Sequence, residues 1–125
     1  MIEITLEIVR ITFGAYILFW GLNGWFGWLP IPRNAIRFES FMTALAETGY
    51  LLEIVKVIEV LSGVLLLVGW QVPLALLALA PVVFVICSAH LWLNFAKGWR
   101  VAIIVGVPYL ILFAQFLPVF TKILQ

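Results

Sequence analysis

Four long runs of apolar residues divide the chain, and they predict four helices that cross a lipid bilayer. The runs cover residues 8–28, 51–69, 72–93 and 101–120. Each has about the 20 residues that an α-helix needs to cross the hydrocarbon core, because a helix rises about 1.5 Å per residue. The runs are apolar on every face, whereas barrel strands alternate apolar and polar side chains, so helices are the expected spanning elements.

A shorter amphipathic segment separates the first two runs. Pro30, Pro32 and Asn34 are expected to break the helix after the first run. The apolar residues that follow recur at helical spacing, opposite Glu39 and Glu47. These apolar residues are Phe38, Phe41, Met42, Leu45 and Ala46. The pattern predicts a short helix that lies along the membrane interface and ends near Gly49.

The predicted fold class is therefore an all-α membrane protein with a single domain over residues 1–125. We expect an antiparallel bundle of four transmembrane helices, with the short interfacial helix between the first two. The other connections are short, around Gln71 and over residues 97–100. Because the chain opens with Glu3 and Glu7 instead of a basic segment, and no small-residue cleavage site follows, the first helix is expected to remain uncleaved.

The composition supports a membrane protein and excludes several partners. Hydrophobic residues make up 66% of the chain and charged residues 10%, and the mean hydropathy is +1.22. A typical soluble domain is about 45 to 50% apolar and about 25% charged. The net charge is +1 and the chain has no basic run, so nucleic acid is not expected as a partner, whereas the lipid bilayer is.

The distribution of basic residues predicts an orientation. Arg33, Arg37, Lys97 and Arg100 lie in the first and third connections, which share one side of the membrane, whereas Lys122 lies on the other side. Because basic loops favour the cytoplasm, we expect these two connections inside and both termini outside. The prediction is a multi-pass protein of the plasma (inner) membrane.

Ionisable residues inside the apolar runs are the candidates for function, because a charge at mid-bilayer costs at least about 2.5 kcal/mol and needs a partner. The second run carries Glu53, Lys56 and Glu59 at spacings of three, so Lys56 pairs with either carboxylate and one negative charge is left. We expect Arg10 to match it, since Arg10 lies roughly 9 Å from mid-membrane and Glu59 lies close to the middle. In the alternative, Arg10 pairs with Glu7 and extends to the head groups.

Glycines support an inward position for the Arg10 face. Gly14, Gly21 and Gly24 fall on nearly the same side of the first helix as Arg10. Such a stripe of small residues lets another transmembrane helix pack closely.

Five further residues of the apolar runs are expected to have structural roles, and for one of them a functional role is also open. His90 lies about 10 Å toward the basic side of the third run, where both a functional role and a satisfied hydrogen-bonding role are open. Asn23 is expected to make interhelical hydrogen bonds, and the single cysteine, Cys87, to be a packing residue. Pro81 and Pro108 lie inside runs and are expected to kink them. The scattered ligand types match no zinc or haem site.

The chain resembles the DoxX-like membrane proteins from about residue 8 to residue 120. The residues that carry the likeness are Arg10 with Phe13 and Gly14, Phe19 with Gly21, Leu22 and Asn23, FMTALAETGY from Phe41, EVLSGVLLLVG from Glu59, PLALLALAP from Pro73, and His90. The resemblance implies a four-helix membrane bundle, and the family includes a subunit of a thiosulfate:quinone oxidoreductase and membrane partners in redox complexes. Its pattern of Arg, Asn, Glu and His matches Arg10, Asn23, Glu59 and His90. A lysine that often follows the asparagine is replaced here by Gly24.

Three functions stay open at this point. The first is an accessory, quinone-linked or redox-associated membrane subunit, in which quinone is the implied cofactor and a membrane oxidoreductase subunit the implied partner. The second is a non-catalytic scaffold or small-lipophile-binding protein, and the third a transporter subunit, which is disfavoured because polar residues of the fourth run are sparse. Homo-oligomers are compatible with the glycine-rich face. The candidates for ligand binding or proton handling are Arg10, Asn23, Glu53, Lys56, Glu59 and His90.

Overall fold

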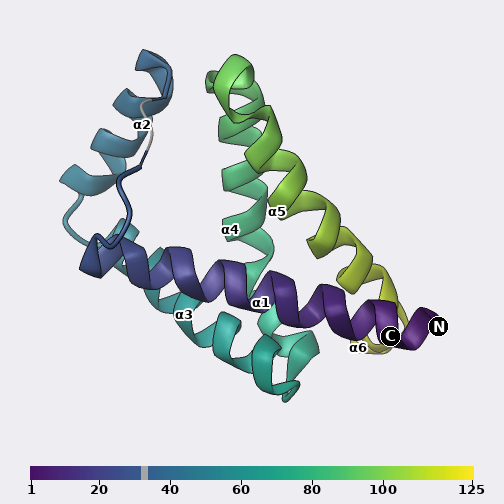
Figure 1. Cartoon of the computed structure of the whole chain (residues 1–125). Helices are drawn as coiled ribbons and strands as arrows, with labels where there is room; N and C mark the ends of the chain where they lie inside the picture. The colour runs from purple at the N-terminus through teal and green to yellow at the C-terminus, as the bar shows by residue number, and fades with distance from the viewer. Residues whose placement is uncertain (32–33) are drawn as a thin grey trace.

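The computed structural model describes residues 1–31 and 34–125, so the predicted helix break at Pro32 and the basic side chain of Arg33 lie outside the described residues. Within this part of the chain every regular element is a helix, which confirms the all-α class (Figure 1). The helices are α1 (Ile2–Phe26), α2 (Ile36–Glu47), α3 (Leu51–Val68), α4 (Val72–Leu93), α5 (Phe95–Gln115) and α6 (Leu117–Ile123).

The second and third apolar runs coincide with helices α3 and α4. Both helices begin where the runs begin, and the turn between them is as short as predicted. Gly69 and Gln71 make this turn in the left-handed region, with φ of 75° and 54°. Glycine adopts that conformation without the steric cost that a Cβ atom adds, so Gly69 is suited to end α3.

The predicted boundaries of the fourth run are wrong at both ends. Residues 97–100, expected to be a connection, belong to α5, because Asn94 alone breaks the helix with φ −148° and ψ 34°. The Asn94 carbonyl accepts the backbone N–H of Lys97 and of Gly98, so α5 starts directly behind this residue. At the other end the helix stops at Gln115, and α6 follows after Phe116.

Helices α1 and α3 form one antiparallel pair with very close backbones. A Cβ atom on Gly14 would lie 2.8 Å from the Leu66 Cβ atom, and one on Gly21 would lie 3.0 Å from the Glu59 Cβ atom. From the other side, a Cβ atom on Gly63 would lie 2.9 Å from the Leu18 backbone. These contacts confirm that the predicted glycine stripe is a packing face.

Helices α4 and α5 form the second antiparallel pair, and hydrogen bonds from α4 and α5 side chains support it. The Tyr109 hydroxyl donates to the Leu76 carbonyl at 2.7 Å, in the helical turn before Pro81. The Cys87 Sγ atom lies 3.6 Å from the Ala102 carbonyl. Cys87 is half-buried against α5, which agrees with its interpretation as a packing residue.

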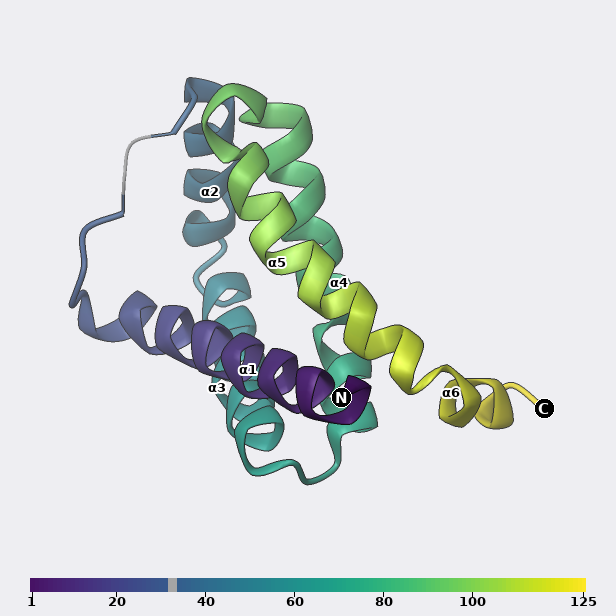
Figure 2. The ribbon, with the colours of Figure 1, turned by 45° about the vertical axis from the view of Figure 1, so that its right-hand side comes forward.

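The two pairs cross each other instead of running in one common direction. Figures 1 and 2 show α1 and α3 lying across the α4–α5 pair, with α6 beyond the end of α5. The core lies where the pairs meet, close to the α3–α4 turn and the end of α5. Its most buried side chains are Phe13, Ile17, Leu66, Leu76, Leu79 and Leu112.

Helix α2 is amphipathic as predicted, but its apolar face packs on protein. Phe38 is buried, and Phe41, Met42 and Leu45 are half-buried, whereas Ala46 is exposed. The Phe38 ring stacks on the His90 ring of α4, with 4.5 Å between the centroids. The helix ends at the predicted place, with Gly49 at φ 80° directly behind it, and lies alongside α4 (Figure 2).

Two of the described helices, α4 and α5, are long and apolar enough to cross a membrane. Helix α3 carries three charged residues, and α1 carries three as well. Helix α3 is strongly apolar, but its three charged residues are more than the criterion for a spanning helix allows. By length, hydropathy and charge, two of the described helices are candidate spans, whereas the sequence pattern predicts four.

Candidate functional site

Arg10 binds the end of α3 and does not pair with Glu59. Its guanidinium donates to the carbonyls of Leu66 and Leu67, the latter at 3.2 Å, and forms an ion pair with Glu7. These carbonyls belong to the last turn of α3, where helical carbonyls lack internal partners and a positive charge is favourable. The prediction of an Arg10–Glu59 pair is thus wrong, and the alternative Glu7 pair is observed.

The register of α1 against α3 explains why Arg10 cannot reach Glu59. Glu59 lies opposite Gly21, and Gly69 lies opposite Arg10, where a Cβ atom would come within 2.9 Å of the guanidinium. Arg10 and Gly21 are 11 residues apart on one helix, which is about 16 Å at about 1.5 Å per residue. This distance exceeds the length of an extended arginine side chain.

Glu59 therefore forms no ion pair with Arg10, and Lys56, one helical turn earlier on α3, is the cation near it. Within residues 1–31 and 34–125, the two ion pairs join other residues, and Glu59 takes part in neither. The residue is half-buried. No enclosed side-chain oxygen or nitrogen of the described residues lacks a hydrogen bond, so the Glu59 carboxylate reaches the surface of the α1–α3 pair. The predicted cluster of Arg10, Glu59 and His90 is not formed.

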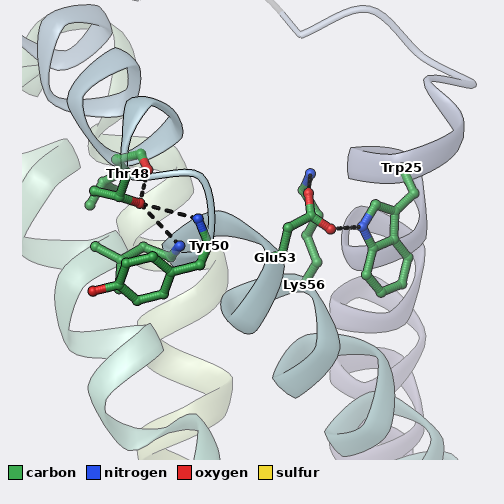
Figure 3. A network of polar contacts seen from close by, with 7 residues as sticks. Trp25, Thr48, Tyr50, Glu53 and Lys56 are labelled. Carbon is green, nitrogen blue, oxygen red and sulfur yellow. Dashed lines mark hydrogen bonds and ion pairs between the residues drawn. The ribbon is translucent and has the colours of Figure 1, made fainter.

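Glu53 and Lys56 lie at the other end of α3, with Trp25 of α1 beside them (Figure 3). The Lys56 ammonium contacts the Glu53 carboxylate at 3.1 Å, and the Trp25 indole N–H donates to the same carboxylate at 2.7 Å. The Lys56 stem packs over Gly24, where a Cβ atom would lie 3.0 Å from the Lys56 Cε atom. The sequence left open whether Lys56 pairs with Glu53 or with Glu59, and the structure shows the pair with Glu53.

Asn23 holds the chain segment that follows α1. Its side-chain amide donates to the Leu29 carbonyl at 3.1 Å and accepts the Leu29 N–H at 2.7 Å. The Asn23 carbonyl also accepts the N–H of Gly27, which ends α1 in the left-handed conformation. Asn23 is 3% exposed. The expected interhelical bonds are replaced by bonds to the backbone of the α1–α2 connection, which supplies the partners that the buried Asn23 side chain needs.

His90 belongs to a polar group that the sequence did not predict. Buried Asn94 accepts the Ala35 N–H at 2.8 Å, donates to the Asn34 side chain at 2.7 Å and lies 3.3 Å from the His90 Nδ1 atom. Gly98 packs directly on the His90 ring. The group fastens the α1–α2 connection to the α4–α5 turn. A lone Asn that directly follows a long apolar run was the available signal for a helix-ending residue.

Two clefts lie near the candidate residues. The first has a volume of about 140 Å³ and is lined by Ala46, Gly49, Tyr50, Leu52, Glu53 and Lys56. The second has a volume of about 410 Å³ and is lined by Glu3, Ile4, Leu6, Glu7 and Gln115. Glu53 and Lys56 are the two candidate residues that line the first cleft, and none of the six candidates lines the second. The candidates are therefore spread over the molecule and do not converge on one cavity.

The apolar composition, the helix pairs and the use of polar side chains at helix ends are those of a helical membrane protein. The sequence model of the DoxX family matches residues 5–92 of this chain. The match covers more than half of the chain, so the protein belongs to the DoxX family, and the resemblance seen in the sequence is confirmed. The comparisons with curated proteins and with solved structures gave no match.

Proposed function

We propose that this DoxX-family protein is a non-catalytic membrane scaffold that presents its apolar faces to lipid or to a partner subunit. The observation that carries the proposal is the use of the candidate polar residues inside the fold. Arg10 binds the end of α3, Asn23 the α1–α2 connection, and the group around Asn94 the α4–α5 turn. A residue engaged in this way contributes to helix register and is not available to a substrate.

The proposal includes four membrane spans with both termini outside the cytoplasm. Asn34 of the α1–α2 connection bonds to Asn94 at the α4–α5 turn, whereas Arg10 bonds to the end of α3 beside the α3–α4 turn. If α4 and α5 cross the bilayer, their two turns lie on opposite sides, so α1 connects one side with the other. Arg37, Lys97 and Arg100 favour the cytoplasm for the Asn94 side. We place the protein in the plasma (inner) membrane.

Labelling of single cysteines tests the span number. In a Cys87→Ser background, cysteines are introduced at Leu29, Trp70 and Trp99 and treated with a membrane-impermeant maleimide on intact cells and on inverted vesicles. Four spans predict that positions 29 and 99 react from the same side and position 70 from the other. Position 29 reacting together with position 70 would show that α1 and α3 do not cross, and would overturn this part of the proposal.

Native mass spectrometry after gentle extraction tests the scaffold role. We expect the chain to retain lipid or a second polypeptide and to carry no quinone. The variants Arg10→Met and Glu59→Gln distinguish a structural role of the polar residues from a chemical role. Only Arg10→Met removes hydrogen bonds that are present in the fold. Arg10→Met should lower both the melting temperature and the retention of partners, and Glu59→Gln should change neither. A quinone lost specifically from Glu59→Gln would contradict the scaffold role.

A quinone-linked accessory subunit is the second candidate, and Glu59 is the observation that favours it. Its carboxylate has no ion pair within the described residues and reaches the surface of the α1–α3 pair between the two charged ends. A carboxylate at that level is placed to exchange a proton with a lipophilic carrier. Ubiquinone or menaquinone binding and membrane quinone reduction should then fall in Glu59→Gln and persist in Glu53→Gln. Equal activity of both variants and the parent chain would exclude this role.

A further inference from the structure

A small, half-open cleft with a mixed polar and apolar lining lies between the end of α2 and the start of α3. Its volume is about 140 Å³, and Gly49 forms part of its wall. Gly49 adopts φ 80°, and a Cβ atom placed on it would meet nothing within 4 Å. Tyr50 borders the cleft and is 58% exposed. The hollow therefore opens outward from the α2–α3 corner.

Two opposite charges line this cleft, and contacts with α1 orient both side chains. Glu53 is held by the Trp25 indole N–H at 2.7 Å and by Lys56 at 3.1 Å. The Lys56 stem is held over Gly24, so its side chain is only 21% exposed. Figure 3 shows Glu53 between Trp25 and Lys56, with both α3 side chains on the side that faces α1. Three residues from two helices thus keep a carboxylate and an ammonium side by side.

The stability of the fold does not account for this arrangement. An exposed ion pair three residues apart on a helix contributes only about 0.3 to 0.5 kcal/mol. A preformed pair of charges is better suited to binding, because the cost of ordering the side chains has been met before a ligand arrives. The complementary ligand carries a phosphate beside a primary ammonium, so that the phosphate meets Lys56 and the ammonium meets Glu53.

The position in the fold indicates where such a ligand comes from. The cleft lies at the end of the α1–α3 pair opposite to Arg10, together with Trp25 and Tyr50. Tryptophan and tyrosine are enriched where a helix leaves the hydrocarbon and meets the lipid head groups. This placement rests on the proposed crossing of the membrane by α1 and α3.

We propose that the α2–α3 cleft binds the phosphoethanolamine head group of a phospholipid. Lys56 binds the phosphate, Glu53 accepts hydrogen bonds from the ammonium, and Trp25 positions Glu53. A phosphatidylglycerol head group lacks the ammonium and meets the Glu53 carboxylate with its negative charge. A phosphatidylcholine head group carries the positive charge but has no N–H group to donate. The site therefore selects phosphatidylethanolamine over both lipids.

Lipid competition on the full chain tests this selection. The purified protein is placed in detergent micelles that contain equal amounts of phosphatidylethanolamine, phosphatidylglycerol and phosphatidylcholine with identical acyl chains, and retained lipids are counted by native mass spectrometry. We expect phosphatidylethanolamine to be retained roughly tenfold over either competitor. Equal retention of the three lipids by the parent chain would overturn the proposal.

Conservative variants assign the selection to the two charges. Lys56→Met keeps the stem over Gly24 and should abolish the preference, whereas Lys56→Arg should keep it. Glu53→Gln keeps an oxygen for the Trp25 N–H and should lose only the preference over phosphatidylglycerol. Lys122→Met and Glu3→Gln change the same net charges outside the cleft and serve as controls. A control that lowers the preference as much as Lys56→Met would overturn the assignment.

Two soluble probes separate a lipid from a free ligand. O-phosphoethanolamine that displaces the retained lipid only at far higher concentration supports a lipid site, whereas binding as tight as that of the lipid assigns the site to a soluble zwitterion. Displacement by inorganic phosphate alone would show a simple anion site and overturn the role of Glu53. Melting temperatures of all variants are measured in parallel. Selection lost in Lys56→Met with an unchanged melting temperature assigns the loss to the cleft and not to unfolding. A parent chain that is fully folded but shows no lipid preference would refute the lipid site and leave the scaffold proposal standing.

Discussion

The α1–α3 pair and the α4–α5 pair are held together by different means. In the first pair, backbones approach so closely that Gly14 and Gly63 have no room for a side chain, and Arg10 closes one end. In the second pair, both helices pass the hydropathy criterion for membrane spans, and apolar side chains with the Tyr109 hydroxyl fill the contact. An apolar helix is compatible with lipid by its composition, whereas a charged helix such as α3 depends on its neighbour.

The largest loss of stability is expected when a methyl group is added in the α1–α3 contact. In Gly63→Ala the new Cβ atom would lie 2.9 Å from the Leu18 backbone, which cannot rotate away. We expect the free energy of unfolding to fall by about 3 kcal/mol, the upper part of the usual cost of overpacking. Thermal unfolding in detergent measures it.

Gly106→Ala in the second pair is the control for this substitution. Its Cβ atom would lie 3.3 Å from the Cys87 Sγ atom, and a single side-chain atom can shift by the small amount needed. The variant should melt close to the parent chain. If both alanine variants lost the same stability, the two pairs would be equally close-packed and the contrast between them would fall.

Removing the cap on α3 should have the next largest effect. Arg10→Met takes away the bonds to Leu66 and Leu67, and hydrogen bonds from a charged group are worth about 2 kcal/mol together with the cost of unpaired carbonyls. Glu7→Gln should cost less than about 1 kcal/mol, because the Glu7 side chain is 61% exposed. Melting curves of the two variants in one detergent compare them. Equal losses would mean that the ion pair, and not the carbonyl contacts, carries the effect.

Asn94→Ala is expected to loosen the link between α2 and the second pair. The substitution leaves the Ala35 N–H and the Asn34 side chain without their partner, at a cost of about 1.5 kcal/mol. Hydrogen exchange should become faster at Ala35 and along α2, and should stay unchanged in α1 and α3. Unchanged exchange at Ala35 would show that α2 is held by the Phe38–His90 contact alone.

A smaller loss than that of Arg10→Met or Asn94→Ala is expected from one hydrogen bond in the α4–α5 pair. Tyr109→Phe removes the hydroxyl that bonds to the Leu76 carbonyl and keeps the ring in the core, so the loss should be about 1 kcal/mol. A melting temperature far below that of Arg10→Met would reverse the ranking, since it would make one hydrogen bond in the apolar pair more important than the cap of the charged pair.

Much of the helical structure could be predicted from the sequence, because each helix is a local pattern. The runs at 51–69 and 72–93 coincide with α3 and α4, and the spacing of Gly14 and Gly21 marked the face that packs. The boundaries of α5 could not be predicted in this way. The Asn94 carbonyl accepts the N–H groups of Lys97 and Gly98, so α5 begins directly after Asn94. The basic residues Lys97 and Arg100 are therefore helical, although in the sequence they resemble a loop.

The candidate site shows what only tertiary structure decided. The sequence alone determined which residues are polar inside the apolar runs, namely Arg10, Asn23, Glu53, Lys56, Glu59 and His90. Their partners depend on the register between helices, which is set by the summed fit of many side chains and has no local signature. A shift of the register by a few turns separates Arg10 from Glu59, and Asn34 meets Asn94 across about half of the chain because the loops fold together.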